Sequence, residues 1–214
     1  MKLYSYFRSS AAFRVRIALN LKGIQVESIA VDLRAAASGQ HQPAYRNVNP
    51  QGLVPALVSD GITISQSLAI IEYLEELQPN PALLPSRPID RARVRAMALV
   101  VACDIHPLNN LRVLNYLRSP LAQEEAAVNA WYRHWVAAGF DALEQHALQS
   151  SGDGRHLFGS SVTLADVLLV PQMYNARRLK CDVSPYPTLC SICTWLEALP
   201  AFAAAVPEVQ PDAL

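Results

Sequence analysis

The sequence has no excess of either charge and no long apolar run. Its 214 residues carry 18 basic and 18 acidic side chains, so the formal net charge is zero. A chain without a basic excess lacks the electrostatic footprint of a nucleic-acid-binding protein. No apolar stretch approaches the roughly 20 residues that span a bilayer, and the N-terminal residues resemble a strand instead of a secretion signal. We therefore expect a soluble cytoplasmic protein with no nucleic-acid or membrane partner.

Cysteine is also scarce. Four cysteines in a chain of this length do not form a disulfide framework, so we expect reduced thiols. The motif Cys190-Ser191-Ile192-Cys193 lies in an apolar helical run, whereas a redox pair needs the turn between a first strand and its helix. The five histidines have no metal-ligand spacing with these cysteines. We expect no metal site.

What the sequence does contain is 51% hydrophobic residues, enough for one large core or two smaller ones. Leu3–Tyr6 alternates like a strand, Ala12–Leu21 has apolar residues at helical spacing, and Val26–Val31 is typical of a second strand. Because a helix supplies the crossover between two strands, the strand–helix–strand order predicts a parallel pair.

The next patterns complete a small α/β half of the chain. They predict a polar loop over 32–42, a helical turn over 44–47, strands over 56–59 and 62–64, and a helix over 68–77. Asp60-Gly61 lies between the two strands and is a strong signal for a β-hairpin.

A proline-rich segment, Pro79–Pro88, predicts a linker, and beyond it strands almost disappear. Apolar residues at helical spacing fill the ranges 89–117, 123–150, 164–180 and 188–205. We therefore predict a mixed α/β domain over 1–79, a linker over 80–88 and an all-α domain over 89–214. Thr163 and Asp166 have the spacing of a capping box and predict the start of a helix.

Two predicted helix starts carry polar side chains that suit an anion as well as a cap. Ser9 and Ser10 precede the first helix, and Gln66 and Ser67 open the helix over 68–77. Each pair has two interpretations, because a helix N-terminus favours a capping oxygen and an anionic ligand for the same electrostatic reason. Pro55 sits where a strand is predicted, so it marks either a protected edge or backbone that pairs with a ligand.

Further candidates lie in the helical half. Pro107 interrupts its predicted helix, and the neighbouring His106 and Asn110 are four residues apart, which places them on one helix face. That face is either solvated or part of a site. Arg177 and Arg178 lie near a helix end, where they either complement the helix dipole or bind an anion.

Two stretches together identify a family. Ser9–Leu19, SSAAFRVRIAL, resembles the signature Ser-Ser-Cys-x-Trp-Arg-Val-Arg-Ile-Ala-Leu of zeta-class glutathione transferases, and residues 60–74, DGITISQSLAIIEYL, resemble the second hallmark of that class. The likeness continues through 170–172, 175–178 and 185–187, so it covers nearly the whole chain. Two departures are Ala11 in place of cysteine and Phe13 in place of tryptophan. Without a protein thiol at Ala11, glutathione is left as the only sulfur nucleophile.

The resemblance implies an architecture and a role for each candidate residue. The fold would be a thioredoxin-like domain followed by a helical bundle. Ser9 and Ser10 would stabilise the thiolate of bound glutathione. The rest of the glutathione molecule would be held by Gln40, the cis peptide Val54-Pro55, Gln66, Ser67, His106, Asn110 and Arg112. The substrate's carboxylates would meet Arg8, Arg112, Arg177 and Arg178, of which Arg8 and Arg178 would also act in catalysis with the two serines.

The implied activity is glutathione-dependent cis–trans isomerisation of maleylacetoacetate to fumarylacetoacetate in phenylalanine and tyrosine catabolism. Three alternatives remain open: isomerisation of maleylpyruvate in gentisate degradation, general transferase or dehalogenase activity, and a non-catalytic binding module that has kept the fold. The family also implies a homodimer.

Overall fold

A computed structural model describes residues 1–34 and 38–213 and divides the chain into two compact units. The first unit comprises Met1–Ala82 together with Ala198–Leu214, and the second comprises Leu83–Glu197. Residues 35–37 of the predicted polar loop lie outside the described residues. Within the described chain, no helix is long and apolar enough to cross a membrane, and no group of three or more His, Cys, Asp or Glu side chains is arranged to hold a metal ion.

The first unit is built on a mixed sheet of four strands. In chain order these are β1 (Lys2–Ser5), β2 (Glu27–Ala30), β3 (Ala56–Ser59) and β4 (Ile62–Ser65). The order across the sheet is β2-β1-β3-β4, in which β1 and β2 are parallel and the other pairs are antiparallel. Helix α1 (Ser10–Lys22) connects the two parallel strands, so the predicted crossover is confirmed.

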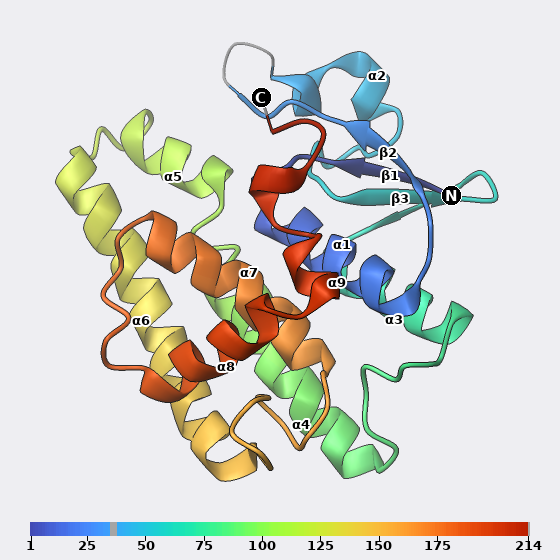
Figure 1. Cartoon of the computed structure of the whole chain (residues 1–214). Coiled ribbons are helices and arrows are strands. Elements are labelled where there is room, and N and C mark those ends of the chain that lie inside the picture. Colours follow the sequence, from blue (N-terminus) through green and yellow to red (C-terminus); the bar gives the residue numbers. More distant parts are fainter. Residues whose placement is uncertain (35–37, 214) are drawn as a thin grey trace. The chain divides into compact units, whose positions relative to one another are not determined.

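Helices cover both faces of this sheet. Figure 1 shows α1 and α3 (Ser67–Leu77) on one face and α2 (Pro43–Arg46), which follows the short 3-10 helix η1 (Gly39–His41), on the other. Leu3 and Leu57 face each other across β1 and β3, and both are buried. The predicted hairpin is confirmed, with Asp60 and Gly61 at φ 50° and 78°, the left-handed region that such a turn requires.

The C-terminal segment also belongs to the first unit. It contains α9 (Pro200–Ala203) and the 3-10 helix η3 (Pro207–Val209). Asn20 Nδ2 donates to Ala201 O at 2.9 Å, Arg16 Nε to Ala205 O at 3.0 Å, and the Phe7 N–H to Asp212 Oδ2 at 2.9 Å. The boundaries therefore differ from the predicted 89–214 domain, because this tail supplies acceptors that the N-terminal residues need.

The second unit is all-helical, as predicted. Its elements are α4 (Pro88–Leu99), the π-helix η2 (Val100–Ile105), α5 (Leu111–Arg118), α6 (Glu125–Ser150), α7 (Leu164–Arg178) and α8 (Pro187–Glu197). The expected continuous helix over 89–117 is instead broken into three elements. Pro107 cannot donate to the helix ladder, and the widened π turn before it closes with a bond from the His106 N–H to Val101 O at 2.9 Å.

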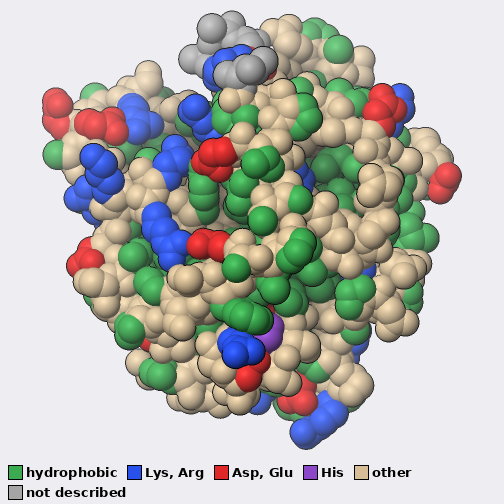
Figure 2. All heavy atoms as spheres, in the orientation of Figure 1, with side chains coloured by type: hydrophobic (Ala, Val, Ile, Leu, Met, Phe, Trp, Pro, Cys, Tyr) green, Lys and Arg blue, Asp and Glu red, His purple; other side chains and the backbone are tan. Residues whose placement is uncertain are grey.

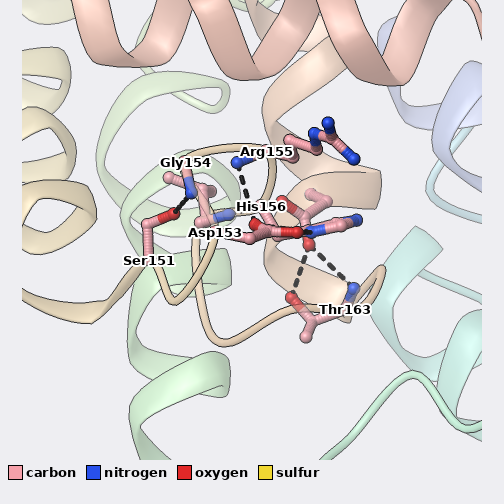
Figure 3. Close-up of polar contacts among 8 residues, drawn as sticks. Ser151, Asp153, Gly154, Arg155, His156 and Thr163 are labelled. Atoms are coloured by element: carbon pink, nitrogen blue, oxygen red, sulfur yellow. Dashed lines mark hydrogen bonds and ion pairs between the residues drawn. The ribbon is translucent and has the colours of Figure 1, made fainter.

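Polar contacts at the start of α7 fix this helix in the bundle. Asp166 is fully buried, and its carboxylate accepts bonds from the Thr163 N–H at 2.7 Å, the Thr163 hydroxyl at 2.8 Å and the Leu157 N–H at 2.8 Å. Figure 3 shows the neighbouring turn, in which the Asp153 side chain lies against His156 and accepts a bond from the Arg155 N–H. The sequence-predicted helix start is therefore confirmed.

Candidate functional site

Ser9 is the N-cap of α1 and terminates a turn in which its own N–H donates to Tyr6 O. Its side-chain oxygen accepts from the Ala12 N–H at 3.2 Å, so the capping interpretation is confirmed. A serine hydroxyl can accept and donate at the same time. Because the cap uses only the oxygen as an acceptor, the hydroxyl proton of Ser9 can still be donated to another acceptor. Ser9 is half-buried, which keeps it within reach of a ligand.

The surroundings of Ser9 favour a negative charge. The first N–H groups of α1 and its dipole create a partial positive charge at this end. Ser10 and Ala11 are buried in the first turn, while Arg8 is exposed with its guanidinium 4.9 Å from the centroid of the Phe7 ring. A thiolate placed beside Ser9 would therefore be stabilised in the same way as a cysteine at a helix N-terminus.

The segment before β3 presents backbone at a defined geometry. The peptide bond between Val54 and Pro55 is cis, which confirms the conformation that the family resemblance implies. The preceding carbonyl, Leu53 O, accepts from the Tyr45 hydroxyl at 2.5 Å and from Asn49 Nδ2 at 2.7 Å. Burial raises the pKa of Tyr45 to about 12, so this hydroxyl stays protonated and donates at neutral pH.

The N-terminus of α3 carries a second cluster of polar side chains in the first unit. Gln66 adopts φ 70°, a left-handed conformation that a residue with a side chain rarely takes, and its Nε2 donates to Gln51 Oε1 at 3.1 Å. Such backbone strain is concentrated at ligand clamps and active sites. Ser67 is buried, and its Oγ accepts from Arg14 Nη1 at 3.3 Å. Gln40 has a buried Oε1 with no hydrogen-bond partner among the described residues, so this oxygen is an acceptor that a ligand N–H could use.

The remaining candidates lie in the second unit. His106 is half-buried after the π-helix, and Asn110 caps α5 by accepting from the Arg112 N–H at 3.1 Å. Arg112 is exposed. Figure 2 shows basic and acidic side chains gathered over α5 and the first turns of α6, where Arg118 pairs with Glu125 at 2.8 Å.

Two adjacent arginines at the end of α7 have different surroundings. Arg177 pairs with Glu197 of α8 at 2.8 Å, which satisfies its charge within the protein. Arg178 is exposed and lies close enough to Tyr132 of α6 for its charge to oppose the rise in the Tyr132 pKa caused by burial. Arg178 is therefore the better of the two for an external carboxylate.

Three residues that shape these sites were not singled out from the sequence. Tyr45 and Asn49 hold Leu53, and nothing in their spacing signals that role. Arg14 is 2% exposed, and a charged residue in the middle of an apolar helical run was a signal that could have found it.

The chain is similar to known proteins in both sequence and fold. Residues 3–82 match the model of the glutathione S-transferase N-terminal domain. The chain is 50% identical to a probable maleylacetoacetate isomerase of Vibrio cholerae over 99% of this chain and 97% of that protein.

Solved structures give the same result. A holo maleylpyruvate isomerase, described as a bacterial zeta-class glutathione S-transferase, is 48% identical with a TM-score of 0.96 and full coverage of both chains. A maleylacetoacetate isomerase of Methylobacterium extorquens AM1, with malonate and glutathione bound, is 42% identical with a TM-score of 0.94 and full coverage of both chains.

The chain belongs to the glutathione S-transferase family, in the zeta class that includes the maleylacetoacetate and maleylpyruvate isomerases. The predicted fold, a thioredoxin-like domain with a helical domain, is confirmed by the same comparisons.

Proposed function

We propose that the protein is a glutathione-dependent cis–trans isomerase that converts maleylacetoacetate to fumarylacetoacetate in phenylalanine and tyrosine catabolism. The observation that carries this proposal is the N-terminus of α1, where Ser9 caps the helix with its oxygen and retains a hydroxyl proton to donate. Bound glutathione would supply a thiolate that adds reversibly to the double bond, permits rotation about the resulting single bond and is then eliminated.

The first unit contains groups that fit each part of glutathione. Ser9 and Ser10 would stabilise the sulfur, and backbone groups at Val54-Pro55 would pair with the cysteinyl unit. Gln66 and Ser67 would hold the γ-glutamyl carboxylate at the N-terminus of α3, and the amide of Gln40 would meet the glycyl end. His106, Asn110 and Arg112 of the second unit are proposed as additional glutathione contacts.

Arginines would recognise the substrate. A dicarboxylic substrate requires cationic partners, and guanidinium groups bind carboxylates in a bidentate manner. We assign this role to Arg8, Arg112 and Arg178. Arg177 would contribute less to substrate binding, because its guanidinium already forms an ion pair with Glu197. Arg8 and Arg178 would in addition stabilise the negative charge that develops on the substrate's oxygen during addition.

An assay of maleylacetoacetate conversion with and without glutathione tests the proposal. The expected result is catalytic turnover that requires glutathione and leaves its concentration unchanged. Activity that does not depend on glutathione would overturn the proposal. Stoichiometric consumption of glutathione, measured by mass spectrometry, would instead support a general transferase or dehalogenase, and failure to bind glutathione in calorimetry would support a non-catalytic module.

Maleylpyruvate is the second candidate substrate, favoured by the similarity to the holo maleylpyruvate isomerase. It needs the same thiol chemistry and the same carboxylate partners. Turnover of both compounds in parallel separates the two, because a large preference for maleylpyruvate would reverse our choice and place the enzyme in gentisate degradation.

The proposed assembly is a homodimer, as the family resemblance implies. The proposed location is the cytoplasm, where the free cysteines Cys103, Cys181, Cys190 and Cys193 would stay reduced. Sedimentation of the purified protein tests the dimer, and a monomeric mass would contradict it.

A further inference from the structure

Arg14 is a buried charge in an apolar helix. It lies in the second turn of α1 and is 2% exposed, among the largest fully buried side chains of the described chain. Taking a guanidinium out of water is costly unless its donors find acceptors in the protein. The partners of Arg14 therefore indicate what its buried charge does.

Arg16, two residues further along α1, shows what a purely structural buried arginine does. Its Nε donates to Ala205 O at 3.0 Å and its Nη2 to Phe7 O at 3.0 Å, while Nη1 reaches Ser5 Oγ at 3.4 Å. These acceptors are mostly backbone carbonyls of the C-terminal tail and of the turn before α1. Arg16 therefore ties chain segments together.

Arg14 points to a different kind of partner. Its Nη1 donates to the hydroxyl oxygen of Ser67 at 3.3 Å, across 53 residues of sequence and within the core of the first unit. Ser67 is the first residue of α3, and Gln66 before it holds the strained φ of 70°. The buried charge thus lies behind the helix start proposed for the γ-glutamyl carboxylate.

This contact restricts how the Ser67 hydroxyl can meet an anion at α3. A serine oxygen that accepts from a cation is restricted in the direction of its O–H, so the proton is oriented toward a different acceptor.

We propose that Arg14 is a positioning residue for the γ-glutamyl carboxylate of glutathione, which acts through the Ser67 hydroxyl instead of touching the ligand. This inference rests on the proposed function, since it takes Gln66 and Ser67 as the site of that carboxylate. It gives the first arginine of the motif Arg14-Val15-Arg16 a role in ligand selectivity and leaves the second with a role in folding.

The test compares two ligands that differ only at the group in question. Glutathione and its analogue with the γ-glutamyl α-carboxylate converted to an amide are titrated by calorimetry into wild type, Arg14→Met and Arg14→Lys. In Arg14→Met we expect glutathione to bind about tenfold more weakly, the effect of losing one charge-assisted contact, and the amide analogue to bind nearly as in wild type. Arg14→Lys, which keeps the charge without the planar fork, should recover part of the preference.

Three further variants separate positioning from folding. Arg16→Lys should lower the unfolding temperature and leave the ratio of the two affinities unchanged. Ser67→Ala should lose the same preference as Arg14→Met, and the double variant should lose little more, because the two residues act through one contact. If Arg14→Met does not fold, Arg14→Lys and Ser67→Ala give the same comparison.

An equal loss of affinity for both ligands in the Arg14 variants, or no loss for either, would overturn the role of Arg14. A wild-type protein that binds glutathione without preferring it over the amide analogue would show that the carboxylate is not held at α3, which overturns this inference and leaves the isomerase proposal standing. A wild type that binds neither ligand would overturn both.

Discussion

At the scale of single residues, Ser9 has two hydrogen-bonding tasks that a hydroxyl can perform together. Its oxygen accepts from the Ala12 N–H, and its proton is the group that a thiolate would use. The two interpretations that the sequence left open, cap or thiolate site, are therefore compatible in one side chain.

Substitution at Ser9 and Ser10 separates these tasks. Glycine is an adequate N-cap, so Ser9→Gly should cost only a few tenths of a kcal/mol, while Ser9→Ala should cost about 1 kcal/mol. Both variants lack the hydroxyl, and we expect isomerisation to fall by about 10²-fold in each, as it does when one donor to a developing anion is removed. Ser9→Ala combined with Ser10→Ala should be at least as impaired. Chemical unfolding and the rate of isomerisation are the two measurements, and a rate that follows stability across the series would contradict the thiolate role.

The two arginines at the end of α7 form a matched pair. Arg178→Leu should reduce kcat/KM by roughly tenfold or more, since a charge-assisted bond to a substrate carboxylate is worth about 1.5–3 kcal/mol. Arg177→Leu removes a partly exposed ion pair with Glu197, so we expect at most about 1 kcal/mol of lost stability and little change in kcat/KM. Steady-state kinetics of both variants tests this. A larger loss of kcat/KM in Arg177→Leu than in Arg178→Leu would show that Arg177 binds the substrate carboxylate instead.

At the scale of elements, the buried carboxylate of Asp166 holds the start of α7. Asp166→Ala would leave the Leu157 and Thr163 N–H groups buried without an acceptor, so we expect a loss of about 3 kcal/mol or more in the free energy of unfolding. Asp153→Ala is the matched control from the neighbouring turn, where the carboxylate is partly exposed, and should cost about 1 kcal/mol. Urea unfolding measures both values, and similar losses would contradict the role of Asp166.

Local sequence signals fixed most elements but not every boundary. Asp60-Gly61, the serines before α1 and the Thr163–Asp166 box were all found, because each depends on a few neighbouring residues. The π turn over Val100–Ile105 was not predicted, because apolar spacing cannot distinguish an α-helix from a slightly wider one. The π-helix packs closely against α6 at Gly139. A Cβ at Gly139 would lie 2.3 Å from the Ile105 side chain, so only glycine leaves room for Ile105 in this position.

At the scale of the whole molecule, the last residues complete the first unit. A variant ending at Glu197 loses the buried Phe202 and the Ala205 carbonyl that accepts from Arg16, so the free energy of unfolding of this unit should fall by more than about 3 kcal/mol. A variant ending at Gln210 loses the bond from the Phe7 N–H to Asp212 and the packing of Ala213 on the first unit, but it keeps Phe202 and the Ala205 carbonyl, so its loss should be smaller, about 1–2 kcal/mol. Thermal unfolding of both variants tests this, and equal midpoints would contradict it.

The sequence by itself determined the α/β and all-α halves, the family and most elements, because these depend on periodicity, turn residues and contiguous motifs. Only the tertiary structure decided that residues 198–214 belong with the N-terminal unit, that Glu197 pairs with Arg177, and that Arg14 lies against Ser67. Each of these contacts joins residues at least 20 positions apart, and no local pattern specifies which distant acceptor a buried or charged group will meet. The Ser9–Leu19 stretch was therefore enough to identify the family. The separate roles of Arg14 and Arg16 depend on their tertiary contacts and could be assigned only from the folded structure.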